Sequence, residues 1–492
     1  MRSALVDTVS EFERTLGEAI RIEGSRPVAC AHSYDRLSRT SGVDLGHQFF
    51  DPRSGTGLDS SGVGSDGDDV RYRLGVSSRS NARLNLSGAE ARRASGTHIA
   101  MIAPCPFPSH QGTQVFLRHL ANALVADGYE LSFFAYASAE QLEEAFLDDR
   151  IELVRAGGRD VGTRSGPSWG RIAGDGALLR RTWTQLRRER PDILHVHNAE
   201  GLALGVLLKR MLGVSLVFHA HNVLAHELPH YVSGKAAKRV VRAAAAIFDR
   251  SLPRLADAVI CFDARQAAHY ASLGVATRRL HVIPLGLDHD ELGEHPIATF
   301  PTPANEPAHA RKYESNALSH APLIVYAGNP DAYQNPDLIR ETIAALRRRC
   351  SRSELRIVSN HPADAFGQLA HAPGVYFRSF RGPRELASLI AEADAGLCAR
   401  TLWTGAPVKI LSYVSVGVPV VACGKGATML AEFPDAGLCT EADPEALADG
   451  LLKVVTNRSG FDVSRMRAAT HIKAHTRAYQ GVYAAVLRDS LR

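Results

Sequence analysis

The sequence predicts an α/β protein in which two parallel-sheet domains face each other across a cleft, behind a long and mostly disordered N-terminal extension. Short apolar runs alternate with amphipathic helical segments from residue 97 to residue 290. The alternation restarts at residue 321, after a stretch, 291–320, that is rich in Pro, Ala, His and Glu and is predicted to be a linker. This pattern is typical of parallel sheets covered by helices on both faces. Because ligands bind at the carboxyl ends of parallel strands, we expect the ligand between the two domains.

Length and composition limit the class of protein. A chain of 492 residues with 45% apolar and 22% charged residues has a globular composition and the length of two or three domains. The net charge of +5 is too small to predict a nucleic-acid partner. The seven cysteines form no C-x-x-C pair, so we expect neither a disulfide framework nor a cysteine zinc site. Cys261, Cys398 and Cys423 stand in apolar runs and are predicted to be buried, in a reducing cytoplasm.

The first 96 residues differ from the rest of the chain. Residues 3–22 carry apolar side chains at helical spacing, and residues 54–69 read SGTGLDSSGVGSDGDD. Such a stretch buries too little apolar surface to offset its ordering entropy. We therefore expect 1–96 to be a mostly disordered extension, either a dispensable tail or an arm that docks a partner. The acidic residues near its start argue against a signal peptide, and the sequence contains no apolar run long enough to predict a membrane span.

The predicted first domain, residues 97–290, opens with an apolar run, a loop and an amphipathic helix that ends at Gly128. Two of its helical segments, 178–191 and 235–254, interleave Arg and Lys with apolar residues. A basic face of this kind suits anionic lipid headgroups, which would place the protein at the inner face of a membrane. A solvated helix face is the alternative. Runs of strand type lie at 97–105, 129–137, 192–198, 214–222, 257–263 and 281–288.

The predicted second domain, residues 321–460, repeats the pattern. Helices are expected from Pro336, from Pro383 and around Lys409 to Val416. A last helical stretch leads from Pro444 towards the end of the chain, and we expect 461–492 to form a C-terminal helical region. Runs of strand type lie at 322–328, 353–360, 374–380, 395–399 and 418–424.

Two glycines stand in the connections that follow predicted strands. Gly112 precedes the helix after the first strand, and Gly328 ends the first strand of the second domain. Glycine lets the backbone approach a ligand closely, and a helix N-terminus offers free N–H groups to an anion. An ordinary strand-to-helix turn has the same residues, so both interpretations stay open. The sequence has no G-x-G-x-x-G after a strand with an acidic residue about 20 positions on, which argues against a nicotinamide-dependent oxidoreductase.

Four histidines fall in the segment 219–230. His219 and His221 share one side of a predicted strand, and His221 stands at its carboxyl end, where it can contact a sugar hydroxyl or a forming charge. Structural packing and metal ligation are the alternatives. Glu227 lies nearby but completes no H-E-x-x-H motif.

A lysine lies in the first turn of the helix predicted within TGAPVKILSYVSVGVPVVACG, residues 404–424. Gly405 and Pro407 form a turn before it, and Lys409 follows. A cation at a helix N-terminus opposes the helix dipole, so its presence favours a bound anion at this point. A solvated lysine is the alternative interpretation.

In this order, the motifs resemble the retaining glycosyltransferases of the GT-B fold known as family four. GAPVKILSYVSVGVPVVA is similar to the family's donor-site helix and following strand, and RLHVIPLGLD to the strand and turn that end its first domain. ADAVICFDARQAAHYASLG and GLCTEADPEALADGLLKVV are similar to two further stretches. The resemblance covers about 97–490. It implies two Rossmann-like domains, a nucleotide-diphosphate sugar on the second, an acceptor on the first, and transfer with retained configuration without a metal or other cofactor.

The resemblance also implies roles for individual residues. His221 matches the histidine that contacts the transferred sugar, and Lys409 lies in the donor-site helix. Gly112 falls where the family's glycine loop approaches the donor diphosphate. Further positions that the resemblance assigns to donor binding are Gly328, Asn329, Gln334, Thr404 and Ser412.

Four of these positions depart from the family's pattern. Thr404 and Ser412 stand where the family has its E-x7-E carboxylates. Asn329 and Gln334 stand where it commonly has Arg and Lys. Neutral partners weaken such contacts, because charge-assisted hydrogen bonds are roughly twice as strong as neutral ones. Lys409 and Arg400 are the residues expected to supply the missing positive charge.

The sequence thus predicts a cytoplasmic glycosyltransferase of polysaccharide or glycoconjugate assembly, with a nucleotide sugar as donor and a glycan or lipid-linked acceptor. The missing carboxylates favour an alternative, a GT-B-like binding or scaffold subunit that has lost catalysis.

Overall fold

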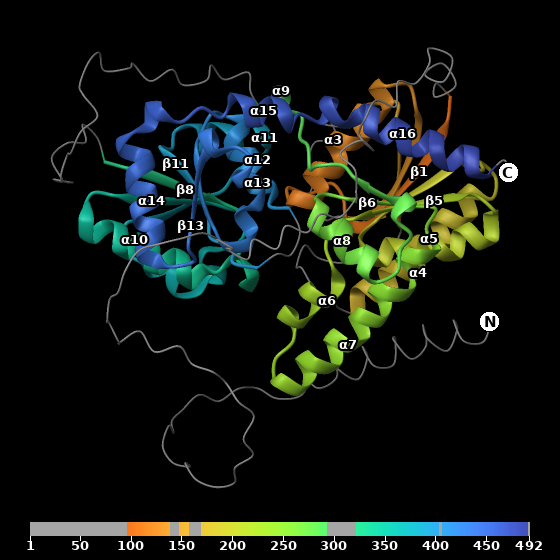
Figure 1. Ribbon diagram of the computed structural model, residues 1–492, viewed down its shortest axis with the longest axis horizontal. Coiled ribbons are helices and arrows are strands. Elements are labelled where there is room, and N and C mark those ends of the chain that lie inside the picture. Colours follow the sequence, from red (N-terminus) through yellow and green to blue (C-terminus); the bar gives the residue numbers. More distant parts are fainter. Residues whose placement is uncertain (1–95, 138–146, 157–168, 293–320, 403–405, 491–492) are drawn as a thin grey trace, which may run out of the picture. The chain divides into compact units, whose positions relative to one another are not determined.

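The computed structural model describes residues 96–137, 147–156, 169–292, 321–402 and 406–490. These residues form two α/β halves, each built on its own parallel sheet (Figure 1). The predicted N-terminal extension, 1–96, lies outside the described residues except for Gly96, and so does most of the predicted linker, 291–320. Among the helices of the described residues, none is long and apolar enough to cross a membrane.

The first sheet has seven strands in the order β3-β2-β1-β4-β5-β6-β7. All of its neighbouring strands pair in parallel. β1, β4 and β5 lie inside the sheet and are buried along almost their whole length, so they read as continuous apolar runs in the sequence. The strands are β1 (His98–Pro106), β2 (Glu130–Tyr136), β3 (Glu152–Ala156), β4 (Ile193–His197), β5 (Ser215–Ala220), β6 (Ala258–Cys261) and β7 (Leu280–Val282).

The second sheet has six parallel strands in the order β10-β9-β8-β11-β12-β13. In both sheets the strand order reverses beside the first strand of the half, β1 or β8, and this switch point is where ligands bind in open α/β sheets. The strands are β8 (Leu323–Ala327), β9 (Glu354–Val358), β10 (Val375–Arg378), β11 (Ala395–Cys398), β12 (Val420–Cys423) and β13 (Gly437–Thr440).

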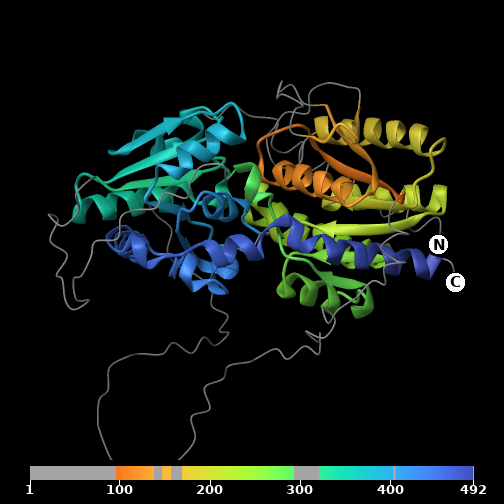
Figure 2. The ribbon, with the colours of Figure 1, turned by 90° about the horizontal axis from the view of Figure 1, so that it is seen from above.

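Helices connect the strands and cover both sheets (Figures 1 and 2). In the first half they are α3 (Gly112–Ala126), α4 (Trp169–Leu186), α5 (Asn198–Leu212), α6 (Leu224–Glu227), α7 (Lys235–Ser251), α8 (Ala264–Ser272) and α9 (His289–Leu292). Later in the chain they are α10 (Pro336–Arg349), α11 (Pro383–Ala391), α12 (Val408–Ser415), α13 (Thr428–Ala431), α14 (Pro444–Thr456), α15 (Ser464–Ala469) and α16 (Ile472–Ser490).

The last helix returns to the first half of the molecule. α16 lies against α3 and β5, as both ribbon views show. The Tyr483 hydroxyl lies 2.9 Å from Nδ1 of His195 in β4, and Gln480 donates a 3.0 Å hydrogen bond to Asp127. The predicted C-terminal helical region, 461–492, therefore divides: α15 contacts α12 of the second half, and α16 completes the first.

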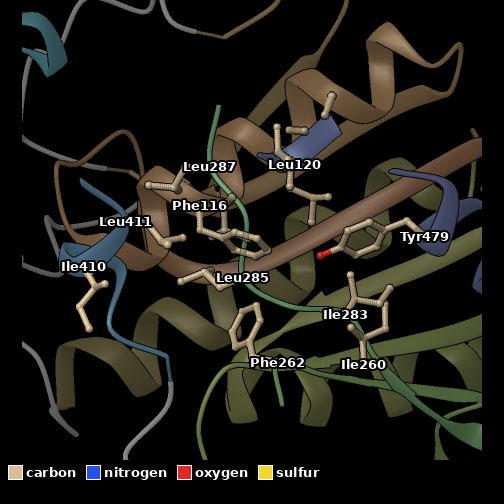
Figure 3. Close-up of a cluster of buried hydrophobic side chains, with 14 of the residues drawn as sticks. Phe116, Leu120, Ile260, Phe262, Ile283, Leu285, Leu287, Ile410, Leu411 and Tyr479 are labelled. Carbon is tan, nitrogen blue, oxygen red and sulfur yellow. The ribbon is translucent and has the colours of Figure 1, made fainter. Parts of the chain in front are cut away.

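One buried apolar cluster runs through both halves. It joins Phe116 and Leu120 of α3 to Ile410 and Leu411 of α12. Figure 3 shows these side chains around the segment that carries Leu285 and Leu287, with Phe262 and Tyr479 beside it. Because interiors are close-packed, this shared cluster holds the N-terminal ends of α3 and α12 near one another.

The structure confirms the expected fold class and adds two strands that the sequence analysis did not identify. β3 is an edge strand of which only Val154 and Ala156 are buried, and its sequence, ELVRA, has no continuous apolar run. β13 is a four-residue edge strand that opens on Gly437. Cys261, Cys398 and Cys423 are buried, as predicted.

Candidate functional site

A cavity of about 730 Å³ lies between the carboxyl ends of the two sheets. We call it the cleft. Its first-domain wall includes the loop after β1 and the start of α3, residues 109–115, together with Asn198 after β4 and Asn222 after β5. Its second-domain wall includes Gly328 and Asn329 after β8, Arg400 after β11, and the start of α12. The parallel sheets thus bring together loops that are far apart in the sequence.

Two helix N-termini meet at the cleft. α3 begins at Gly112 and α12 at Val408, and neither has a side-chain cap or an acidic residue in its first turn. A Cβ atom on Gly112 would lie 3.0 Å from the Val408 Cβ, tighter than ordinary van der Waals contact. Gly112 therefore permits the close approach of the two helices. Their first N–H groups have no partner within the helix, and together with the helix dipoles they favour an anion at this point.

Lys409 projects its ammonium group from the start of α12 to the carboxyl end of β8. Its Nζ donates a 2.8 Å hydrogen bond to Oε1 of Gln334 and lies 3.8 Å from the centroid of the Tyr326 ring. Burial lowers the pKa of Lys409 from its usual 10.5 to about 7. Near pH 7 the Lys409 amine therefore takes up a proton when an anion enters the cleft, since a nearby opposite charge favours the protonated form.

Gly328 makes room for that ammonium. Its φ is +153°, and a Cβ atom there would lie 3.0 Å from the Lys409 Nζ. Both the backbone conformation and the space favour glycine at this position. The approach of a ligand to the backbone at Gly328 stays a prediction.

Two further polar groups of the second-domain wall lie beside Lys409. The Asn329 side chain donates a 2.7 Å hydrogen bond to Asp331. The Arg400 guanidinium lies 5.1 Å from the centroid of the Tyr333 ring, within the range of a cation–π contact. Lys409 and Arg400 thus put two cations in this wall, where the sequence has Asn329 and Gln334 in place of basic residues.

Of the two residues that stand in place of the E-x7-E pair, the structure describes one. Ser412 lines the cleft, and its hydroxyl has a long, 3.5 Å contact with the Val408 carbonyl oxygen one turn earlier in α12. Thr404 lies outside the described residues.

His221 does not lie where the sequence analysis expected it. It is 6% exposed, is absent from the residues that line the cleft, and packs edge-on against Phe116 and Phe262. Its Nε2 lies 3.0 Å from Nδ1 of His197. The strand ends at Ala220, and the chain turns there. Asn222, the residue after His221, therefore lines the cleft instead of His221. The expectation that His221 faces the cleft is corrected, because its ring points into the core.

His221 belongs to a buried group of four histidines with His195, His197 and His219, which we call the histidine cluster. Burial lowers the pKa of His195 and His221 to about 3 and the pKa of His197 and His219 well below the usual value. All four rings are therefore neutral at pH 7. His195, His197 and His219 each offer a ring nitrogen within 4.8 Å of the others, and Asp288, Asp290 and His471 form a second group of this kind. None of these residues lines the cleft.

The sequence analysis considered Glu227 only as a metal ligand and did not place it in the site. Glu227 lines the cleft at the end of α6. It accepts a 2.8 Å hydrogen bond from Nδ2 of Asn222 and a 3.0 Å hydrogen bond from the Tyr231 hydroxyl. Burial raises its pKa. The available signal was weak: a carboxylate seven residues after the end of an apolar run, in the segment VLAHELPHY.

The first-domain wall carries further charges. Arg155 and Arg171 line the cleft there, together with Asp148, Asp149 and Glu200. Arg118 also lines it and forms an ion pair with Glu291 of α9. Both domains therefore contribute cations to the cleft.

Models of two protein families match the chain. The model described as Glycosyltransferase Family 4 matches residues 110–291, and the model described as Glycosyl transferases group 1 matches residues 321–457. Together the matches span most of the two halves and leave the N-terminal extension outside. No curated protein matches the chain in sequence.

Many solved structures share the fold. Sucrose-phosphate synthase from Thermosynechococcus elongatus is 17% identical with a TM-score of 0.62, and the match covers 79% of this chain and 100% of that one. A glycosyltransferase from Rickettsia africae is 14% identical with a TM-score of 0.55, over 80% and 99% of the chains. HepE from Anabaena, solved in complex with UDP, is 17% identical with a TM-score of 0.53, over 79% and 100%. At these identities the likeness shows the fold.

Proposed function

Since the chain belongs to the group 1, family 4 glycosyltransferases of the GT-B fold, we propose that it transfers a sugar from a nucleotide-diphosphate sugar to a glycan or lipid-linked acceptor, with retention of the anomeric configuration. The nucleotide sugar would bind the second-domain wall and the acceptor the first-domain wall. No metal or other cofactor takes part in this proposal. We propose 97–290 and 321–460 as the two domains.

The meeting of the α3 and α12 N-termini beside Lys409 is the observation that carries this proposal. A diphosphate placed there would receive N–H groups from two helices and the charge of Lys409. The Lys409 ammonium donates a hydrogen bond to Gln334, which stands at the position where the family commonly has a lysine. Lys409 thus supplies from α12 the charge that position 334 lacks. The related HepE, which has been solved with UDP-glucose, supports a nucleotide sugar as the ligand.

The same groups would promote the reaction. As the bond between the anomeric carbon and the diphosphate oxygen breaks, negative charge grows on the leaving nucleoside diphosphate. Donors already fixed around that charge stabilise the transition state more than the ground state. Arg400, held over the Tyr333 ring, adds a second cation on the same wall. The acceptor hydroxyl would approach from the first domain, and its proton would leave with the diphosphate.

The exposed face of α7 bears on the acceptor and its location. The exposed face of α7 presents Val240, 51% exposed, and Ile247, 56% exposed. The basic residues Lys238, Arg239, Arg242 and Arg250 are exposed on the same helix. Such a face suits anionic lipid headgroups, and it supports a cytoplasmic enzyme that acts on a lipid-linked acceptor at the inner face of a membrane, in polysaccharide or glycoconjugate assembly.

A second candidate function is a binding or scaffold subunit without catalysis. The Ser412 position favours it, because a hydroxyl stands there in place of a carboxylate and has only a long contact with its own helix.

One experiment separates the two functions. The purified chain would be incubated with UDP-, GDP-, ADP- and dTDP-sugars and an extract of cellular glycolipids, and release of the nucleoside diphosphate would be followed by chromatography. Turnover with one donor, and a product whose anomeric configuration matches the donor by NMR, is the result we expect. Binding of a nucleotide sugar without turnover supports the scaffold. If the chain neither binds nor turns over any of these donors, both functions are contradicted.

A further inference from the structure

We infer that Glu227 binds hydroxyl groups of the transferred sugar and is the carboxylate that serves this chain in place of the absent E-x7-E pair. This inference rests on the function proposed above and adds to it a residue from the other domain. In the family pattern both acidic positions lie in the second half of the chain, whereas Glu227 follows the fifth strand of the first sheet.

The local structure fixes the Glu227 carboxylate at the cleft. β5 ends at Ala220, Asn222 turns into the cleft, and the four-residue helix α6 ends at Glu227. Asp249 of α7 accepts hydrogen bonds from the backbone N–H groups of Leu224 and Ala225, of 3.3 and 2.9 Å. The N-terminal end of α6 is therefore tied to a long helix, and Glu227 is held by a rigid support.

Each oxygen of Glu227 has one donor from the protein. Oε2 accepts from Asn222 and Oε1 from Tyr231. A carboxylate offers about four acceptor positions, so two remain for a ligand. Both donors line the cleft as well, and the three polar groups form a ready-made set of acceptor and donors of the kind that sugar hydroxyls bind.

The position of Glu227 relative to Lys409 suits a sugar attached to a diphosphate. Glu227 interacts electrostatically with Arg400 and Tyr333 of the second domain. Tyr333 directly precedes Gln334, which holds the Lys409 ammonium. The transferred sugar is bonded to the diphosphate, so its hydroxyls lie within one ring of the phosphate that Lys409 would hold. Glu227 and Lys409 line the same cleft, so the Glu227 carboxylate is available to the hydroxyls of that ring.

A purely structural role is the competing explanation, since Glu227 also joins Asn222 to Tyr231. Ligands with and without the sugar distinguish the two. A residue that contacts the sugar affects the binding of a nucleotide sugar but not of the bare nucleoside diphosphate. A residue that only supports the loop affects both alike or neither.

The test measures the affinity of wild type and E227Q for UDP and UDP-glucose, and for GDP and GDP-mannose, by calorimetry. E227Q keeps the shape of the side chain but loses its charge and one acceptor. E130Q, an exposed position at the start of β2, is the matched control. We expect E227Q to bind the preferred nucleotide sugar at least tenfold more weakly, with affinity for its nucleoside diphosphate within twofold of wild type. E130Q should match wild type with both ligands.

Deoxy sugars supply the second measurement. Wild type should lose affinity for UDP-glucose analogues that lack the hydroxyl bound by Glu227, and E227Q should not distinguish them from UDP-glucose. Y231F, which removes one of the carboxylate's two donors, should fall between wild type and E227Q. Equal losses for nucleotide and nucleotide sugar in a folded E227Q, or no loss at all, would overturn the role of Glu227 and leave the proposed function standing. Wild type that binds none of the UDP-, GDP-, ADP- and dTDP-sugars of the donor panel would instead remove the proposed function, and this inference with it.

Discussion

Replacement of Lys409 by methionine tests how the cleft holds a diphosphate. The pKa of Lys409 falls from 10.5 to about 7 on burial. At about 1.4 kcal/mol per pKa unit, this difference of about 3.5 corresponds to about 5 kcal/mol that disfavours the charged form in the empty cleft. A bound diphosphate favours the charged form and raises the pKa again. Binding therefore takes up a proton above pH 7.

Two results follow for the affinity of wild type and variant. Wild type should bind the preferred nucleotide sugar progressively more weakly above pH 7, by up to about tenfold per pH unit. K409M should bind at least tenfold more weakly than wild type at pH 6.5, and its affinity should not change between about pH 6.5 and 8.5. The control K453M replaces an exposed lysine of α14 and should behave as wild type.

The free energy of unfolding of the empty protein should rise with pH, whereas the affinity for the donor falls. Between pH 7 and 10.5 the unfolded chain binds a proton at Lys409 that the folded chain does not, so stability rises with pH, and the full penalty is present below pH 7. Lys409 is only partly buried, and K409M also loses the bond to Gln334. We therefore expect about 1–2 kcal/mol of the penalty to be recovered at pH 7, a rise in Tm of a few degrees. Equal donor affinity in K409M and wild type would refute this reasoning, as would a pH-independent wild-type affinity.

Three further predictions concern other parts of the molecule. G112A should weaken nucleotide-sugar binding about tenfold by calorimetry, because the new Cβ would lie 3.0 Å from Val408. The double variant G112A/V408A should recover much of the lost affinity. If it recovers none, contact with Val408 is not the cause of the loss. Stability in urea should fall steeply below pH 6.5, because the histidine cluster stays neutral in the folded protein but is protonated in the unfolded chain. The free energy of unfolding should fall by up to about 1.4 kcal/mol per histidine per pH unit. A urea midpoint that does not change between pH 7 and 5 contradicts this. Y483F should lower stability by about 1–2 kcal/mol in the same assay, because it leaves His195 Nδ1 buried without its partner. The control Y479F, on the same helix, removes a buried hydroxyl that has no hydrogen-bond partner among the described residues, and it should change stability little.

The sequence predicted the fold because the central strands are buried on both faces. β1, β4 and β5 read as continuous apolar runs, and the helices between them carry regular turns and stops. Edge strands gave no such signal. β3 alternates between buried and partly exposed residues and contains charges, so it resembles a loop in sequence. The return of α16 to the first sheet also has no local signal, because it depends on which surface its apolar face finds.

The sequence could predict that a residue lies at the cleft where its position follows from its own backbone. Gly112, Gly328 and Lys409 lie at helix starts or strand ends, and the structure brings them to one cleft. His221 was misplaced because a strand-end position does not tell which way the chain turns next; the ring points into the core and Asn222 takes its place. Glu227 was missed because its importance depends on partners five residues before and four residues after it and on the opposite domain.

The central claim is that the cleft binds a nucleotide sugar with its diphosphate between the N-termini of α3 and α12 and Lys409. The most direct test is the Tm of wild type and K409M with UDP-, GDP-, ADP- and dTDP-sugars at pH 6.5. A ligand at 100 times its Kd stabilises the folded protein by about 2.7 kcal/mol. The account predicts a clear rise in Tm for wild type with one nucleotide and a much smaller rise for K409M. No rise with any of the four, or the same rise in both proteins, would contradict it.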